Sequence, residues 1–377
     1  MYWQIQKFIE ENSNTLYSIL KDLCLIPAPS GCEEKRAAYC LNWLKENGAH
    51  EAYMDDAYNV ILPWCIDNSK DITVFAAHTD TVFPDTAPMP YEEKDGKIFC
   101  PGVGDDTAHV AILLLAVKFF IQNNIKPDCG YLFVFNSCEE GLGNLKGVRK
   151  LMEEYAGRIA RFVTYDALLG VLHDECVGSH RYEVEVSTRG GHSFQDFGIP
   201  NAIAALSELI SKIYRITPPQ VENSRTTYNV GIVSGGTSVN TIAQSASMLC
   251  EYRSNSYMCL DMMKQEFEKI FTEGNREGIC VQIKQIGDRP CANIDSKVQK
   301  AFSGRCADVV ANVLEKDVIF KPASTDCNIP LSLGIPSVCI GLYEGGGAHT
   351  REEWLVKDSL LKGFEVALQI GMDLLRS

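Results

Sequence analysis

Short apolar runs of strand length alternate with helical segments along most of this chain, and this alternation limits the folds that it can adopt. Four runs have the length of a strand: residues 72–77, 131–135, 161–165 and 337–341. A continuous apolar run of this length indicates a strand that is buried on both faces. Residues 110–120 and 145–155 have the pattern of helices. Because strands that alternate with helices form βαβ units, we predict an α/β domain with a mostly parallel sheet.

The pattern changes near residue 180 and returns near residue 289. In between, the segment reads as a strand at 182–188, a helix at 201–214, strands at 228–233 and 246–252, a helix at 260–275 and a strand at 280–286. This β-α-β-β-α-β order is the ferredoxin-like arrangement of an α+β domain. We therefore predict a domain at 180–288 that is inserted into a larger catalytic domain made of 1–179 and 289–377.

Composition and charge narrow the functional classes. The 377 residues are 46% hydrophobic and 22% charged, as in an ordinary soluble globular protein. The formal net charge of −14 argues against a nucleic-acid-binding surface and leaves no polybasic patch for a membrane surface. The longest apolar stretch, 110–121, is interrupted by Lys118 and is too short to span a bilayer. We expect neither nucleic acid nor membrane as a partner.

The cysteines point to a reducing compartment. The chain has 15 of them and no CxxC pair. A chain of this length can bury a core without disulfides, so we interpret the cysteines as mostly buried thiols. Residues 1–7 do not show a basic segment followed by an apolar one, so no secretory signal is expected. These features together predict a cytoplasmic protein.

Glu139 and Glu140 are adjacent acids just after the strand predicted at 131–135. Two carboxylates placed side by side repel each other, so stability alone does not favour the pair. The pair makes sense if a cation binds one carboxylate and a reaction uses the other as a base. Taken alone, such a pair is more often a solvated helix start. The residues themselves do not say which of the two acids would have which role.

Other residues of metal-binding type also follow predicted strands at the point where each ends. They are His78 and Asp80 after 72–77, Asp166 after 161–165, His349 after 337–341, and Asp105 with Asp106 in a loop before the helix at 110–120. Open α/β sheets bind ligands outside the carboxyl ends of their strands, so we expect these side chains to converge. Singly, an HxD turn or an acid pair before a helix is commonly a hydrogen-bonded turn or a helix cap. Their combination indicates a shared site.

The donor types in this set suit zinc and neighbouring divalent ions. Two imidazoles and several carboxylates are more than one open catalytic zinc uses, since such a zinc usually keeps three protein ligands. They are enough for two ions that share one carboxylate, which is the arrangement of many aminopeptidases and nucleases. The sequence therefore predicts a hydrolytic site with two divalent ions, most readily zinc, with cobalt and manganese as alternatives.

The motifs around these residues resemble those of the M20 metallopeptidases, a group that contains tripeptidases, carboxypeptidases, dipeptidases and aminoacylases. In the larger domain the matching motifs are 77–80 (AHTD), 104–108 (GDDTA), 138–143 (CEEGLG), 165–167 (YDA) and 347–350 (GAHT). In the inserted domain they are 190–193 (GGHS), 238–241 (SVNT) and 251–254 (EYRS). The resemblance covers nearly the whole chain.

The resemblance implies a role for each of these residues. One ion would be held by His78, Asp105 and Asp166, and the other by Asp105, Glu140 and His349. Asp105 would thus bridge the two ions. Glu139 would be the general base, and Asp80 would orient His78. The chain departs from the family at Thr107, where a lysine is usual, and this leaves the support of the loop and the substrate range open.

In the family the inserted domain acts as a lid, and members pair through it into homodimers. The resemblance makes His192, Asn240 and Arg253 candidates for substrate binding. Arg253 would bind a substrate carboxylate through its planar fork, although a surface ion pair is the alternative. His192 would stabilise a developing oxyanion, and its alternative is a histidine that serves only a turn.

These expectations combine into a two-metal hydrolase that cleaves amide bonds of short peptides, as an exopeptidase of the tripeptidase or dipeptidase kind. The partner would be a short peptide. A deacylase that acts on an N-acyl amino acid uses the same metal centre and stays open as an alternative. A third reading is an inactive homologue that binds peptides.

Overall fold

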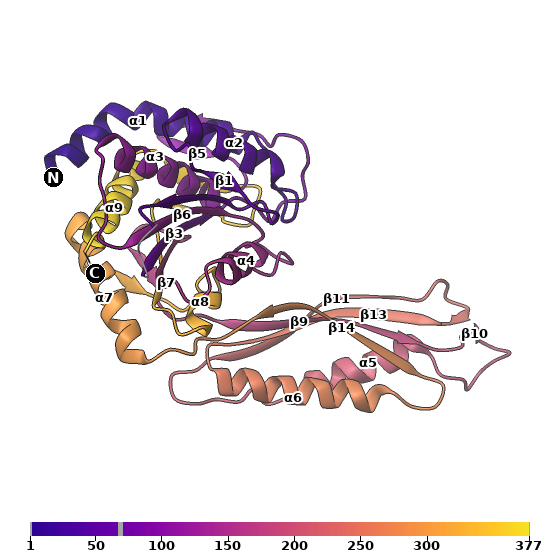
Figure 1. Cartoon of the computed structure of the whole chain (residues 1–377). Coiled ribbons are helices and arrows are strands. Elements are labelled where there is room, and N and C mark those ends of the chain that lie inside the picture. The colour runs from indigo at the N-terminus through magenta and orange to yellow at the C-terminus, as the bar shows by residue number, and fades with distance from the viewer. Residues whose placement is uncertain (1, 67–70, 377) are drawn as a thin grey trace. The chain divides into compact units, whose positions relative to one another are not determined.

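The computed structural model describes residues 2–66 and 71–376, and these form two compact units (Figure 1). The larger unit consists of the chain up to Cys176 and from Asn293 onward, and the inserted unit is Val177–Ala292. The inserted unit extends a few residues beyond the range 180–288 on both sides. The reason is that its first strand begins at Gly178, its last strand ends at Arg289, and Cys291 packs in its core.

The larger unit is built on a mixed sheet of eight strands. Their order is β1 (Tyr53–Met54), β2 (Val60–Trp64), β6 (Gly130–Asn136), β3 (Ile72–His78), β7 (Ile159–Tyr165), β16 (Ser337–Ile340), β8 (Val171–His173) and β15 (Ile319–Phe320). The neighbours β6, β3, β7 and β16 are parallel to one another. β2 runs antiparallel to β6, and β8 runs antiparallel to β16. The α/β class is confirmed, but only the centre of the sheet is uniformly parallel.

Helices cover both faces of this sheet. Figure 1 shows α1 (Tyr2–Cys24), α2 (Glu34–Glu46), α3 (His109–Gln122) and α9 (Ser359–Asp373) on one side, with α4 (Lys146–Glu154) and α8 (Asn328–Ser332) on the other. The helix α7 (Ser296–Leu314) packs against α9 and β16. α3 is apolar nearly all round and almost entirely buried, as its sequence HVAILLLAVKFFIQ requires. The central strands β3 and β6 are buried along their full length.

A smaller antiparallel sheet in the same unit supports the loops around the strand ends. Its order is β17 (Gly345–Gly346), β18 (Trp354–Val356), β5 (Lys97–Phe99) and β4 (Glu92–Lys94). The chain leaves β5, passes through a short helical segment, η1 (Val103–Ala108), and continues into α3. This path places Asp105 and Asp106 directly before α3. Among the described residues, no helix has the length and apolar character needed to cross a membrane.

The inserted unit is an antiparallel sheet of four strands with two helices. In chain order its main elements are β9 (Gly178–Ser187), α5 (Ala202–Ile213), β11 (Thr226–Gly235), β13 (Ser245–Ser254), α6 (Tyr257–Gly274) and β14 (Cys280–Arg289). The strands lie in the order β11-β13-β9-β14. The core between sheet and helices includes Val184, Met248, Tyr252 and Phe267. A separate ribbon joins β10 (Gly191–His192) to β12 (Thr241–Ile242).

Candidate metal centre

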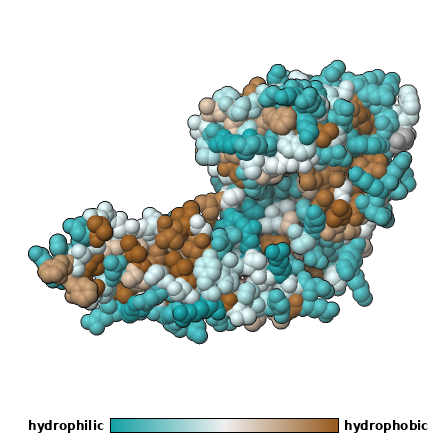
Figure 2. Space-filling model, turned by 180° about the vertical axis from the view of Figure 1, so that it is seen from behind, coloured by the Kyte–Doolittle hydropathy of each residue, from teal (hydrophilic) through white to brown (hydrophobic). Residues whose placement is uncertain are grey.

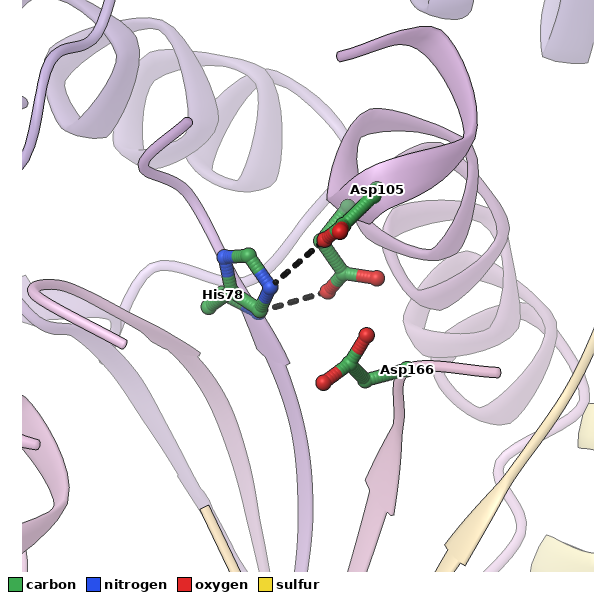
Figure 3. Close-up of side chains that lie close together, drawn as sticks. His78, Asp105 and Asp166 are labelled. Carbon is green, nitrogen blue, oxygen red and sulfur yellow. Dashed lines mark hydrogen bonds and ion pairs between the residues drawn. The ribbon is translucent and has the colours of Figure 1, made fainter. Parts of the chain in front are cut away.

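The carboxyl ends of the central parallel strands bring the metal-type residues together. His78 is the last residue of β3, Asp166 directly follows β7, and Glu139 and Glu140 lie three and four residues beyond the end of β6. Because β6, β3 and β7 are adjacent and parallel, their carboxyl ends meet at one edge of the sheet. Figure 3 shows His78, Asp105 and Asp166 facing a common space there.

Asp105 lies between the two histidines and turns one oxygen toward each. Its Oδ1 is 3.2 Å from Nε2 of His78, and its Oδ2 is 2.9 Å from Nε2 of His349. The same Nε2 of His349 is 3.0 Å from Oε1 of Glu140. A carboxylate that faces two imidazoles in this way has the geometry of a group shared between two neighbouring ligand sets, one with each histidine.

The described residues provide three groups of donor atoms in which all atoms lie within 4.8 Å of one another. The groups are His78, Asp105, Asp106 and Asp166; His78, Glu139 and Glu140; and Asp105, Glu140 and His349. His78 Nε2 and Asp105 Oδ1 are buried and face each other without the geometry of a hydrogen bond. Two buried donors that converge without satisfying each other fit ligands of a cation, and imidazole with carboxylate suits zinc, cobalt or manganese.

Electrostatics of the site also fits a cation. Burial, together with the charge of Asp105, raises the pKa of Asp166 well above its usual value. Burial likewise raises the pKa of Glu140 to about 7. Hydrogen bonds with Asp105 and Glu140 raise the pKa of His349 to about 11. Acids with a raised pKa resist ionisation, because a buried negative charge near other negative charges is unfavourable. A divalent cation bound among them would offset this unfavourable energy.

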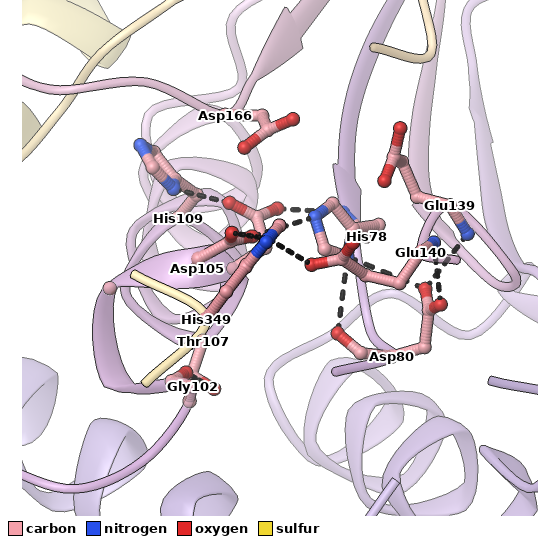
Figure 4. A network of polar contacts seen from close by, with 12 residues as sticks. His78, Asp80, Gly102, Asp105, Thr107, His109, Glu139, Glu140, Asp166 and His349 are labelled. Carbon is pink, nitrogen blue, oxygen red and sulfur yellow. Dashed lines mark hydrogen bonds and ion pairs between the residues drawn. The ribbon is translucent and has the colours of Figure 1, made fainter. Parts of the chain in front are cut away.

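Asp80 connects the end of β3 to the loop that carries the two glutamates (Figure 4). Its carboxylate accepts hydrogen bonds from the backbone N–H of Glu139 at 3.0 Å, the N–H of Glu140 at 2.9 Å and the hydroxyl of Ser30 at 2.6 Å. Nδ1 of His78 lies 3.1 Å from the backbone oxygen of Asp80 and 3.4 Å from its Oδ1. Burial alone would raise the pKa of Asp80, but these partners outweigh it and hold the pKa below its usual value. Asp80 therefore fixes both the His78 ring and the glutamate loop.

Glu353 holds the loop of Asp105, and the sequence reasoning assigned it no role. Its carboxylate accepts hydrogen bonds from the backbone N–H groups of Gly102, Gly104 and Asp105, at 2.6, 2.9 and 2.9 Å. Gly104 is required there, because a Cβ would come within 2.3 Å of the ring of Tyr343. Glu353 is far from this loop in the sequence and follows no predicted strand, so no local pattern indicates the contact.

Asp106 and His109 form a second buried layer behind the site. Asp106 Oδ2 accepts a hydrogen bond from the backbone N–H of His78 at 2.7 Å, and its Oδ1 contacts Nδ1 of His109. The backbone N–H of Leu342 donates to Nε2 of His109 at 3.2 Å. Burial lowers the pKa of His109 to about 3. His109 is thus a buried packing residue, and Asp106 supports His78 through the backbone.

Asp326 is another buried acid near this edge that the sequence reasoning did not single out. Its Oδ2 accepts a hydrogen bond from the side-chain amide of Asn136 at 2.7 Å, and Asn136 pairs with His78 in the sheet. Burial raises the pKa of Asp326 to about 8. The backbone oxygen of Asn136 in turn accepts bonds from the N–H and hydroxyl of Thr79. Asp326 therefore steadies the ends of β3 and β6.

The three substrate-binding candidates lie in the inserted unit. His192 and Asn240 are neighbours at the β10–β12 ribbon, where the N–H of Ser193 donates to the backbone oxygen of Asn240 at 3.0 Å. Both side chains are exposed. Arg253 lies on β13 and donates its fork to Glu251, with Nε 2.8 Å from Oε1 and Nη2 3.1 Å from Oε2. This is the ion pair that was the alternative reading for Arg253.

Comparisons with known proteins place this arrangement in a family. A family model described as Peptidase family M20/M25/M40 matches residues 74–373. A succinyl-diaminopimelate desuccinylase of Corynebacterium glutamicum is 23% identical over 338 residues, which are 87% of this chain and 88% of that protein.

Solved structures share the fold. A tripeptidase from Staphylococcus aureus subsp. aureus Mu50 superposes with a TM-score of 0.75 at 22% identity, covering 95% of this chain and 97% of that one. Aminopeptidase PepT from Bacillus cereus ATCC 10987 gives a TM-score of 0.74 at 19% identity, covering 96% and 99%.

The region that matches the family model contains every candidate ligand and spans most of the chain. The prediction of an amide-bond hydrolase with M20-type motifs is confirmed at the level of the family. This chain belongs to peptidase family M20/M25/M40.

Proposed function

We propose that this protein is a two-metal hydrolase that cleaves the amide bonds of short peptides, as an exopeptidase of the tripeptidase or dipeptidase kind. The observation that carries the proposal is the position of Asp105, whose two carboxylate oxygens face His78 and His349 respectively. Such a carboxylate can bridge two ions, and the remaining donors divide into one set on each side of it. The pair of ions would be zinc, with cobalt or manganese as alternatives.

The proposed ligand sets are those that the family motifs suggest. His78 and Asp166 would complete one side of Asp105, and Glu140 and His349 would complete the other. All of these donors fall into the close groups of the structure. Two ions bound there would polarise the scissile carbonyl and lower the pKa of a water molecule between them.

The residues of the chain supply the proton transfer and the orientation. Glu139 would take the proton of the attacking water and return a proton to the leaving amine. Its carboxylate is nearly excluded from solvent, which favours transfer to the substrate over exchange with bulk water. Asp80 would keep the ring of His78 in one orientation through Nδ1, so that Nε2 stays directed toward Asp105.

The inserted unit would act as the substrate-binding lid. His192 and Asn240, exposed side by side at one ribbon, would contact the reacting carbonyl, and Arg253 would bind a carboxylate of the substrate. Arg253 would exchange its pairing with Glu251 for the substrate, because both partners are carboxylates of the same shape. A short peptide with a free carboxyl terminus fits this requirement.

A deacylase that acts on an N-acyl amino acid is the second candidate. It is favoured by the relatives named succinyl-diaminopimelate desuccinylase and N-acetyldiaminopimelate deacetylase. The exopeptidase is favoured by the solved structures named tripeptidase and aminopeptidase. Both reactions need the same metal centre. They differ in the lid and in whether a free α-amine is recognised. An inactive peptide-binding homologue is the third and weakest candidate, since the full set of metal-type residues is present.

A substrate panel tests the proposal. Tripeptides, dipeptides and acetylated or succinylated amino acids would be assayed with the metal-reconstituted protein, with and without a chelator. We expect release of an amino-terminal residue from peptides and loss of turnover in the chelator. Turnover of acyl amino acids without peptide cleavage would select the deacylase, and no turnover of any substrate by the metal-loaded protein would overturn both enzymatic readings.

We further propose that a second copy of this chain pairs with the inserted unit. Among the residues that the structure describes, β11 is an edge strand that pairs with β13 on one side only, and its Ile232 and Val233 are more than half exposed. Hydrophobic side chains gather on the surface of this unit (Figure 2). Light scattering after size exclusion should give a dimer for the natural chain and a monomer for Val233→Lys. A monomeric natural chain would reject this pairing. The cytoplasmic location stays a prediction.

A further inference from the structure

Arg36 is a buried cation directly behind the candidate metal centre, and no motif accounts for it. We propose that Arg36 is a positioning residue that holds the turn after β3 and the Asp105 loop against each other, and that it supplies beside this loop the positive charge that the family's usual lysine would bring at position 107. This inference rests on the proposed two-metal function. It identifies a residue that supports the Asp105 loop, a loop whose support could not be predicted because Thr107 replaces the usual lysine.

The guanidinium of Arg36 makes five hydrogen bonds although the side chain is only 1% exposed. Nη1 donates to the backbone oxygen of Thr79 at 3.0 Å and to the hydroxyl oxygen of Thr107 at 3.3 Å. Nη2 donates to the oxygens of Leu23 and Ile26 at 3.0 and 2.8 Å, and Nε donates to Ile26 at 3.2 Å. Every one of these acceptors is neutral.

The two threonines are the points at which Arg36 reaches the metal centre. Thr79 stands between His78 and Asp80 at the end of β3. Thr107 follows Asp105 and Asp106 in η1, and its hydroxyl donates to the backbone oxygen of Gly102, where the same loop begins. One planar group therefore connects the segment of His78 to the segment of Asp105, the two ligands whose donor atoms face each other.

The charge of Arg36 matters because the two segments that it contacts carry buried acids, although its own hydrogen-bond acceptors are neutral. Burying a cation among neutral acceptors is costly, and a packed apolar side chain would fill the space without that cost. Two features offset the cost here. The carbonyls at the C-terminal end of α1 favour a positive charge. The carboxylates of Asp80, Asp105 and Asp106 are carried by the segments that Arg36 contacts, and a buried cation eases their crowding.

The alternative is that Arg36 only closes the end of α1. A lysine placed at position 107 distinguishes the two roles, because it could replace the positive charge of Arg36 but not its hydrogen bonds to α1. A lysine at 107 would return a positive charge to the Asp105 loop, because the side chain of residue 107 adjoins the guanidinium of Arg36. It would not restore the bonds to Leu23 and Ile26 as a guanidinium makes them, since a lysine is a single point donor on a flexible stem.

A set of four proteins tests the proposal: the natural chain, Arg36→Met, Thr107→Lys and the double variant Arg36→Met/Thr107→Lys. The readouts are divalent-ion affinity by chelator competition, the thermal midpoint of the metal-free protein, and kcat and KM on the substrate found in the panel. We expect Arg36→Met to weaken metal binding by about 10- to 100-fold, the range for groups that orient metal ligands. The double variant should recover to within a few-fold of the natural chain.

Thr107→Lys alone should be worse than the double variant, because two cations would then share one buried space. Equal metal affinity in the double variant and in Arg36→Met would reduce Arg36 to a cap of α1 and overturn the proposal. If Arg36→Met does not fold, Thr107→Val serves instead, since it keeps the shape and removes the hydroxyl that Arg36 contacts. It should weaken metal binding several-fold and also lower the thermal midpoint, because it removes the buried bond from Thr107 to Gly102 as well. Unchanged affinity would overturn the proposal.

These readouts separate this inference from the proposed function. Failure of the natural chain to bind two divalent ions would reject the two-metal function itself. Normal metal binding by Arg36→Met, with the natural chain binding two ions, would reject only the role of Arg36.

Discussion

The candidate residues of the two units differ in burial and in the number of bonds that fix them. In the larger unit, His78, Asp80 and Glu139 are almost fully buried. The carboxylate of Asp80 accepts hydrogen bonds from three different residues. In the inserted unit, His192 and Asn240 are exposed and are held mainly by contacts within their own ribbon. A centre that must hold cations and move a proton needs fixed, dehydrated groups. Residues that meet a substrate need access to it.

The largest effect should come from the residue proposed as the base in the larger unit. Glu139→Gln removes the proton acceptor but keeps the volume, so kcat should fall by about 10²- to 10⁴-fold, the usual contribution of general acid–base catalysis. Metal content, measured by elemental analysis, should stay at two ions per chain. Glu153→Gln, on the outer face of α4, is the matched control and should keep the natural rate. A near-natural rate for Glu139→Gln would place the base elsewhere.

Histidines of the two units should separate metal binding from substrate binding. His349→Ala removes a donor that faces both Asp105 and Glu140, so it should lower the metal content from two ions per chain to one. His192→Ala should retain both ions and lower kcat, because His192 belongs to the exposed ribbon. Elemental analysis after dialysis measures the first effect and steady-state kinetics the second. Loss of an ion in His192→Ala would contradict the proposal that the larger unit binds the metal ions and the inserted unit binds the substrate.

The pH dependence of stability tests the acid crowding around His349 in the metal-free protein. Hydrogen bonds with Asp105 and Glu140 raise the folded-state pKa to about 11, from 6.5 in the unfolded chain. A raised pKa means that the folded state holds the proton more tightly, so this stabilisation is complete below pH 6.5 and is lost as pH rises through about 11.

In urea denaturation with chelator present, the difference in unfolding free energy between the natural chain and His349→Gln should therefore shrink from pH 6 to pH 10. The ring of His349 is more than half exposed, which screens the effect and keeps it modest. His173→Gln is the control, since burial lowers the pKa of His173 instead of raising it. A difference that is constant over this range would contradict the ion pairs with Asp105 and Glu140.

The smallest effect concerns the ion pair on the open face of the inserted unit. Glu251→Gln should lower the free energy of unfolding of this unit by about 0.2–1 kcal/mol, as for other partly exposed ion pairs. It should also lower KM for a substrate with a free carboxylate, because the substrate then no longer competes with the Glu251 carboxylate for Arg253. Denaturation followed by circular dichroism and steady-state kinetics measure the two effects. An unchanged KM in both Glu251→Gln and Arg253→Gln would remove Arg253 from the substrate site.

Much of the candidate metal centre could be predicted, because most of its residues directly follow the end of a predicted strand. His78, Asp166 and the pair Glu139–Glu140 follow apolar runs that the structure shows as the parallel strands β3, β7 and β6. The antiparallel edge of the sheet was missed. β2 directly follows the two-residue strand β1 and not a helix, and its short sequence VILPW does not distinguish the direction in which it pairs.

The supporting residues could not be found in this way. Glu353 binds a loop that is 249 residues away in the sequence, and Asp326 contacts Asn136 across 190 residues. Asp326 is a lone acid in its segment, and Glu353 lies beside Glu352 but follows no predicted strand. Only the packing of β18 and of the segment before α8 against the strand ends brings them into place.

The amino-acid sequence by itself determined the class of the larger fold, the family and the identity of the metal-type residues, because each depends on local patterns of apolar runs and short motifs. The tertiary structure decided how those residues are held. It turned the two oxygens of Asp105 toward different histidines, buried Asp80 beneath both glutamates and placed the guanidinium of Arg36 between two ligand-bearing segments. The physical reason is that hydrogen bonds and buried charges join residues that are distant in sequence, and only a folded chain sets those distances.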